Sequence, residues 1–122
     1  MSSGLDLAER IAKIAEEKRG EDITVLDLRK VSGVCDAFVL VSATSSVRAR
    51  TIAEFIEKEM GAQDEWVIRR AGVREGNWVV LDYGNVMVHI FLEETRKFYD
   101  LERLWGDAAR MSRPRAKEDK KQ

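Results

Sequence analysis

One run of apolar residues without alternation, Ala37-Phe38-Val39-Leu40-Val41, constrains the fold more than any other segment. A strand that is apolar on both faces has to lie inside a sheet that is covered on both sides. The run leads into Ala43-Thr44-Ser45-Ser46, which offers several N-cap residues for a helix. The segment therefore predicts a central strand followed by a helix, and an α/β domain.

The segments on either side of this run supply further elements. Apolar residues from Leu7 to Ile14 recur at the spacing of one helix face, and Gly20 is placed to end that helix. Residues 23–28 are β-branched and apolar, and they predict a strand. The helix that follows the central strand also has an apolar stripe, and we expect it to stop at Gly61.

The second half of the chain predicts a hairpin and a closing helical segment. Two β-rich runs, Trp78–Asp82 and Val86–Phe91, flank the loop Tyr83-Gly84-Asn85, and so short a glycine-containing loop favours a hairpin. Residues 66–69 predict another short strand, and residues 93–105 predict short helical turns. The chain is therefore expected to form a mixed sheet of about five strands with helices packed on it.

Charge is unevenly distributed along the 122 residues. Residues 112–122 hold five basic and two acidic side chains, so the net charge of this segment is +3. The formal charge of the whole chain is −1, so the remaining residues have a net charge of −4. An acidic body suits a basic protein partner better than a phosphate backbone. We expect one domain over residues 1–109 and a basic, disordered tail over residues 110–122, with RNA contact at most through that tail.

Composition argues against several kinds of site. The single cysteine and the single histidine, Cys35 and His89, cannot form an internal disulfide or a Cys/His zinc site, and His89 is interpreted as a half-buried strand residue. No apolar run reaches the roughly 20 residues that cross a bilayer. The first residues, with Asp6 and Glu9, lack the features of a leader. We expect a cytoplasmic protein with no membrane contact, metal ion or cofactor.

Two features leave an enzymatic alternative open. The joint at residues 43–46 is a place where helix N–H groups can hold a phosphate, but Ala43 stands where a close approach favours glycine, and helix capping explains the hydroxyls. Asp27, Asp36 and Asp82 lie on or beside predicted strands, but they lack the paired spacing of a magnesium site. A nucleotide-binding enzyme or nucleotidyltransferase is therefore the alternative, and a protein without catalytic activity is the preferred interpretation.

Aromatic, arginine and aspartate side chains are concentrated in residues 74–84 and 98–105. Trp, Tyr and Arg dominate binding hot spots because they bury large areas and keep a polar group. We interpret Phe98, Leu101 and Leu104 as core residues under a closing helix. The candidate partner-binding residues are Arg74, Trp78, Asp82, Tyr83, Tyr99, Asp100 and Arg103.

Four segments together resemble the ribosomal silencing factor (Iojap-like) family. They are Val25-Leu26-Asp27-Leu28, residues 36–46, residues 75–91 and Phe98-Tyr99-Asp100-Leu101-Glu102-Arg103-Leu104-Trp105. The hairpin combined with the last segment is the specific part of the resemblance, which extends over residues 5–109. Two positions depart from the family pattern: Asn85 stands where Asp is common, and Ala37 stands where Tyr is common.

The resemblance implies a nucleotidyltransferase-like fold without transferase activity. It also implies a translational repressor that binds the large ribosomal subunit through a basic ribosomal protein, the fourteenth of that subunit. Bound there, such a factor sterically blocks association with the small subunit and lowers translation under nutrient limitation. Members of the family often form homodimers, so a homodimer is a further expectation.

Overall fold

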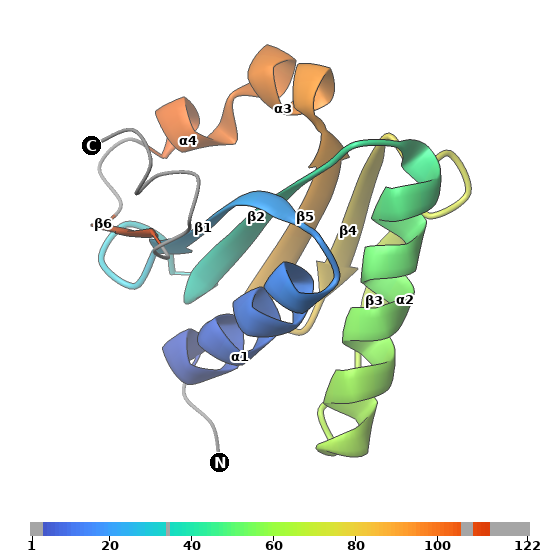
Figure 1. Cartoon of the computed structure of the whole chain (residues 1–122). Helices are drawn as coiled ribbons and strands as arrows, with labels where there is room; N and C mark the ends of the chain where they lie inside the picture. Colours follow the sequence, from blue (N-terminus) through green and yellow to red (C-terminus); the bar gives the residue numbers. More distant parts are fainter. Residues whose placement is uncertain (1–3, 34, 106–108, 113–122) are drawn as a thin grey trace.

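The structure, a computed structural model, describes residues 4–33, 35–105 and 109–112. Six strands form one mixed sheet in the order β3-β4-β5-β2-β1-β6, in which β2 and β5 are parallel and the other neighbours are antiparallel. The strands are β1 (Glu21–Asp27), β2 (Ala37–Ala43), β3 (Arg69–Ala71), β4 (Trp78–Asp82), β5 (Val86–Leu92) and β6 (Ala109–Ser112). The helices are α1 (Gly4–Glu17), α2 (Ser46–Ala62), α3 (Glu93–Tyr99) and α4 (Leu101–Leu104) (Figure 1). The predicted mixed α/β architecture is confirmed.

Strand β2 lies inside the sheet, between β5 and β1, as its apolar pattern predicts. All seven of its residues are buried. Val39 and Val41 belong to the apolar cluster on one face, whereas Phe38 and Leu40 belong to the cluster on the other. Both faces of β2 are therefore covered, which is the reason that it lacks polar alternation.

Helices α1 and α2 pack on the first of these faces and share its larger apolar cluster with the strands (Figure 1). Helix α2 begins with a cap, because the Ser45 hydroxyl accepts a hydrogen bond from the Arg48 N–H at 3.1 Å. The capping interpretation of this joint is confirmed. The predicted end of the helix at Gly61 is wrong, since α2 continues to Ala62. The absence of a side chain at Gly61 leaves room for the Trp66 ring, which would lie 2.7 Å from an added Cβ.

The predicted hairpin is confirmed, with β4 and β5 flanking the turn at Gly84, whose φ is +93°. The strand predicted at residues 66–69 is displaced along the chain, because β3 begins only at Arg69, which pairs with Asp82 at the end of β4. Pairing with β4 sets the start of β3, whatever the β-propensity of the residues before it. Trp66 and Ile68 consequently lie outside the sheet and are 66% and 67% exposed.

Helices α3 and α4 lie by the opposite face, over a smaller apolar cluster. Its buried members are Leu26, Leu28, Cys35, Phe38, Leu40 and Phe91, with Trp78, Met87, Leu101 and Trp105 packed against them. The predicted closing helical segment is confirmed. The interpretation of Phe98 and Leu104 as core residues is wrong, because they are 80% and 71% exposed; two helices this short turn only part of their surface to the sheet.

Strand β6 extends the sheet past the predicted domain end at residue 109. It pairs with β1 from Ala109, opposite Asp27, to Ser112, opposite Thr24. The prediction of a disordered tail is therefore wrong for residues 110–112, and the rest of that tail lies outside the described residues. Within the described ranges, no helix has the length and apolar character needed to span a membrane.

Candidate partner-binding surface

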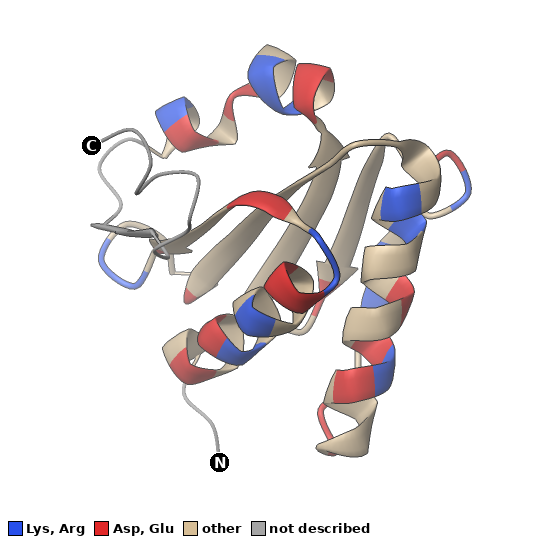
Figure 2. Ribbon diagram, viewed as in Figure 1, with Lys and Arg blue, Asp and Glu red and all other residues tan. Residues whose placement is uncertain are grey.

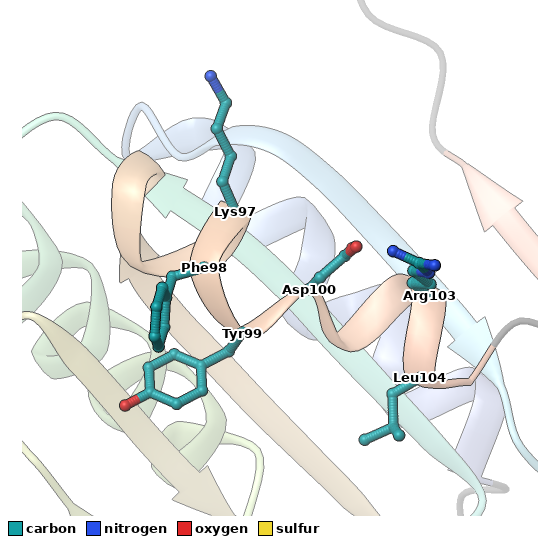
Figure 3. A pocket seen from close by; sticks show the side chains of 6 residues that line it. All are labelled: Lys97, Phe98, Tyr99, Asp100, Arg103 and Leu104. Atoms are coloured by element: carbon teal, nitrogen blue, oxygen red, sulfur yellow. The ribbon is translucent and has the colours of Figure 1, made fainter.

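The junction of α3 and α4 carries an exposed set of side chains that we call the elbow surface. Its residues, which line an open depression of about 580 Å³, are Lys97, Phe98, Tyr99, Asp100, Arg103 and Leu104. Figure 3 shows the aromatic rings and Leu104 on one side of the junction and the charged side chains on the other. The elbow surface thus combines exposed apolar area with charges of both signs, which is the composition of a protein-binding surface.

Asp100 forms the bend between the two helices. Its backbone is left-handed, with φ 49° and ψ 56°, and it serves as both the C-cap of α3 and the N-cap of α4. Its N–H donates to the Arg96 carbonyl at 2.8 Å, and its own carbonyl accepts from the Leu104 N–H at 3.2 Å. Aspartate tolerates this conformation better than most residues. Because the carboxylate makes no capping bond, it stays available at the surface.

A row of aromatic rings connects the elbow surface to the sheet. The half-buried Trp78 lies 4.6 Å from Tyr99 between ring centroids, and Tyr99 packs edge-on against Phe98 at 5.0 Å. On its other side, Trp78 donates its indole N–H to His89 Nδ1 at 3.0 Å. The exposed rings are therefore held in place before any partner arrives, which reduces the entropy lost on binding.

Arg96 holds α3 and α4 to the sheet, and the sequence analysis missed it. Its side chain is 8% exposed, and the guanidinium forms a two-point ion pair with Glu102, the shorter contact being 2.8 Å. It also donates to the Asp22 carbonyl at 2.7 Å and to the hydroxyls of Ser42 and Thr24 at 2.8 and 3.3 Å. These acceptors come from β1, β2 and α4, so the sequence around Arg96 carries no sign of their convergence.

His89 lies beneath this surface as a neutral imidazole. It is 6% exposed, and burial lowers its pKa from the ordinary 6.5 to about 4. Because Nδ1 accepts from Trp78, the ring carries its proton on Nε2, which has no hydrogen-bond partner among the described residues. A second proton on the ring would go to Nδ1. The hydrogen bond from the Trp78 indole would then be lost, because two N–H groups would face each other.

The stability of the protein is therefore expected to fall as the pH is lowered from 6.5 toward 4. In this window the unfolded chain binds a proton at His89 that the folded chain does not bind, so acid favours unfolding. A difference between pKa values of 6.5 and about 4 corresponds to roughly 3 kcal/mol at full effect. Urea unfolding at closely spaced pH values measures this loss.

His89→Asn is the matched control for that titration. Asparagine places an acceptor oxygen near the position of Nδ1, so it can keep the bond from Trp78, but it does not titrate. The variant should lack the part of the pH dependence that lies between 6.5 and 4, whatever its stability at neutral pH. Equal slopes in the two proteins would show that His89 does not control acid stability.

The structure brings together four of the seven predicted partner-binding residues. Tyr99, Asp100 and Arg103 line the elbow surface, and Trp78 supports it from β4. Arg74 lies elsewhere, in the loop between β3 and β4, where its carbonyl accepts from Arg50 of α2. Arg74 therefore does not belong to the elbow surface, and the partner-binding role of the seven residues stays a prediction.

Asp82 and Tyr83 also do not belong to the elbow surface. Tyr83 is 8% exposed and lies in the cluster under α1 and α2, where burial raises the pKa of its hydroxyl. Asp82 is half-buried at the far end of β4 from Trp78, and its carboxylate accepts from the Gly84 N–H at 2.8 Å. Both residues stabilise the hairpin and its packing instead.

Two of the acidic residues that could have suggested a metal centre, Asp27 and Asp82, are engaged locally. The Asp27 carboxylate forms a two-point pair with Arg29, and the side-chain hydrogen bond lowers the pKa of Asp27. Across the described part of the chain, no three His, Cys, Asp or Glu side chains are grouped so that they could hold a metal ion.

Comparison with known proteins gives consistent matches. The family described as "Ribosomal silencing factor during starvation" (RsfS) matches residues 2–122. A Bacillus subtilis protein named ribosomal silencing factor RsfS is 37% identical over 97 residues, which cover 80% of this chain and 82% of that protein. The chloroplastic protein Iojap of Zea mays is 31% identical over 110 residues, 90% of this chain and 48% of that protein. A Chromobacterium violaceum crystal structure has the same fold, with a TM-score of 0.83 over 93% of this chain and 92% of that one at 24% identity.

Proposed function

Since the chain belongs to the ribosomal silencing factor family, we propose that it is a translational repressor that binds the large ribosomal subunit. Bound at the face where the subunits join, it sterically blocks association with the small subunit and lowers translation under nutrient limitation. The observation that supports this proposal is the elbow surface, an exposed and preorganised group of aromatic, apolar and charged side chains.

The contact is made with a basic ribosomal protein, the fourteenth of the large subunit. Phe98, Tyr99 and Leu104 supply the apolar centre of the interface, and Asp100 supplies a carboxylate for the partner's cations. Arg103 lies at the rim, and Trp78 contributes by holding Tyr99. An interface of ordinary size buries about 800 Å² on each partner, and a surface of this kind can form the centre of such an interface.

Blocking the subunits requires no chemical step, so the protein acts as a cytoplasmic binding factor without catalytic activity. The rival function is that of a nucleotide-binding enzyme. It would rest on a fold like that of nucleotidyltransferases, and this likeness in fold stays a prediction. The depression at the ends of β2 and β5 is lined by Glu21, Glu93 and Glu94. Three carboxylates there would repel a triphosphate.

In sucrose gradients, the purified protein is expected to sediment with free large subunits and to be absent from joined ribosomes. Added before the small subunits, it should lower the yield of joined ribosomes, because it occupies the contact face. Immunoblots of the gradient fractions and light scattering during subunit mixing measure the two effects.

Two controls separate this proposal from its rivals. Equal amounts of the protein on large subunits and on joined ribosomes would contradict steric blocking. Saturable micromolar binding of a magnesium nucleoside triphosphate in calorimetry would favour the enzyme instead.

A homodimer in isolation is part of the proposal, and sedimentation equilibrium of the purified chain tests it.

A further inference from the structure

A buried histidine lies beneath the aromatic row that leads to the elbow surface. His89 of β5 is 6% exposed, so it cannot itself contact a docked protein. The hairpin register pairs Trp78 with Phe91, which makes His89 the diagonal neighbour of Trp78 on the same face of the sheet. The Trp78 indole N–H donates to His89 Nδ1 at 3.0 Å. An effect of His89 on the elbow surface would therefore pass through Trp78.

His89 lies in uncharged, largely aromatic surroundings. Strands β2 and β5 contain no charged side chain, and Figure 2 shows this uncharged part of the sheet beneath α3. The rings of Phe38 and Phe91 lie 4.6 and 6.2 Å from the His89 ring between centroids. A hydrogen bond in such surroundings is stronger than one in water, because solvent competes less for its donor and acceptor. The bond to Nδ1 therefore fixes the orientation of the Trp78 indole.

Histidine is an unfavourable choice for stability at this position. Its Nε2 is buried and has no hydrogen-bond partner among the described residues. A buried polar atom without a partner costs folding free energy, and a leucine would fill similar space in this apolar cluster without that cost. The hydrogen bond to Trp78 is the contact that the histidine supplies and a leucine would not. What this bond does for the indole is therefore a better explanation of His89 than stability.

We infer that His89 is a positioning residue for partner binding, which holds the Trp78 indole in the orientation on which Tyr99 rests. The inference rests on the proposed function, because it needs a partner that binds at the elbow surface. Tyr99 is 52% exposed and lies 4.6 Å from Trp78 between ring centroids, and Phe98 packs edge-on against Tyr99. Without the bond, the indole and the Tyr99 ring would each sample more orientations, and binding would have to order both of them.

Replacement of His89 by leucine and by asparagine tests this inference. The two side chains have nearly the same shape, but only asparagine offers an acceptor oxygen near the position of Nδ1. His89→Leu should bind purified large subunits about tenfold more weakly, because two further side chains must be ordered on binding. His89→Asn should bind within about threefold of the parent chain. Urea unfolding should rank the two variants in the opposite order, because leucine removes a buried polar group and asparagine keeps one.

The Trp78 indole proton supplies a readout that a merely structural role of His89 would not move. In protein labelled with nitrogen-15, exchange of this proton with solvent should be at least about tenfold faster in His89→Leu than in the parent chain, and protected in His89→Asn. Trp78→Phe identifies the resonance among the three tryptophans. Phenylalanine also keeps a ring beside Tyr99 but has no indole N–H. In the Trp78→Phe background, His89→Leu should therefore cause no further loss of affinity.

Each outcome supports or overturns the positioning role. Equal affinities of His89→Leu and His89→Asn for large subunits would overturn it and leave the proposed function standing. A full loss of affinity caused by His89→Leu in the Trp78→Phe background, or losses that follow the free energy of unfolding across the variants, would do the same. A parent chain that does not bind large subunits would overturn the proposed function itself, and with it the surface that His89 serves.

Discussion

Arg96→Met is expected to lower the free energy of unfolding by about 3–5 kcal/mol, the range for breaking one side of a buried ion pair. Methionine fills similar space but donates no hydrogen bond. The change therefore leaves the Glu102 carboxylate, the Asp22 carbonyl and the hydroxyls of Thr24 and Ser42 without their donor. Ser42 is 3% exposed, so water cannot take the place of the guanidinium without opening the packing. Urea unfolding followed by tryptophan fluorescence and by circular dichroism measures the loss.

Two further variants separate the buried network from a general effect of charge removal. Lys97→Met removes a neighbouring charge whose side chain is 76% exposed, and it should cost less than about 0.5 kcal/mol. Arg96→Met combined with Glu102→Gln should be more stable than the sum of the single effects predicts, because the amide no longer leaves an unpaired charge. An Arg96→Met protein as stable as the parent chain would show that the network does not hold α3 and α4.

The elements that the sequence predicts well are those with a local signal. Strand β2 is apolar on both faces, the hairpin has a glycine turn, and α2 has a serine cap; each of these causes acts within a few residues. Strands β3 and β6 depend on partners outside their own residues, and the partner of β6 lies far along the chain. Three residues of β3 pair because β4 presents a free edge, and β6 forms against β1. Neither register can be deduced from the residues of the short strand alone.

Residue type predicted four of the side chains that lie together at the elbow surface, but it did not predict which neighbouring apolar side chains are exposed. Hydrophobicity suggested burial for Phe98 and Leu104, although helices as short as α3 and α4 leave part of their surface uncovered. Tyr83 lies away from Trp78 because side chains alternate along a strand and the two residues are an odd number of positions apart. Their side chains accordingly lie in clusters on opposite faces of the sheet.

Replacing Phe98 and Leu104 together by serine is expected to weaken binding to the large subunit about a thousandfold, if each side chain is a hot spot that contributes at least about 2 kcal/mol. The fold should persist, because these side chains are 80% and 71% exposed and contribute little to the core. Serine removes the apolar centre of the elbow surface and leaves its charged residues in place. Titration of labelled protein with purified large subunits, together with urea unfolding, measures binding and stability separately.

Trp66 and Ile68 provide the matched control for this pair of substitutions. They are 66% and 67% exposed, so their replacement by serine removes a comparable apolar area near Gly61 and Gly84 rather than at the elbow surface. If exposed apolar side chains act only through nonspecific hydrophobic association, both double variants should weaken binding to the same extent. If the elbow surface contacts the ribosomal protein, only the Phe98 and Leu104 variant should lose affinity. A folded variant at the elbow that binds subunits as tightly as the parent chain would place the interface elsewhere, because the most exposed apolar side chains of α3 and α4 would then contribute nothing to it.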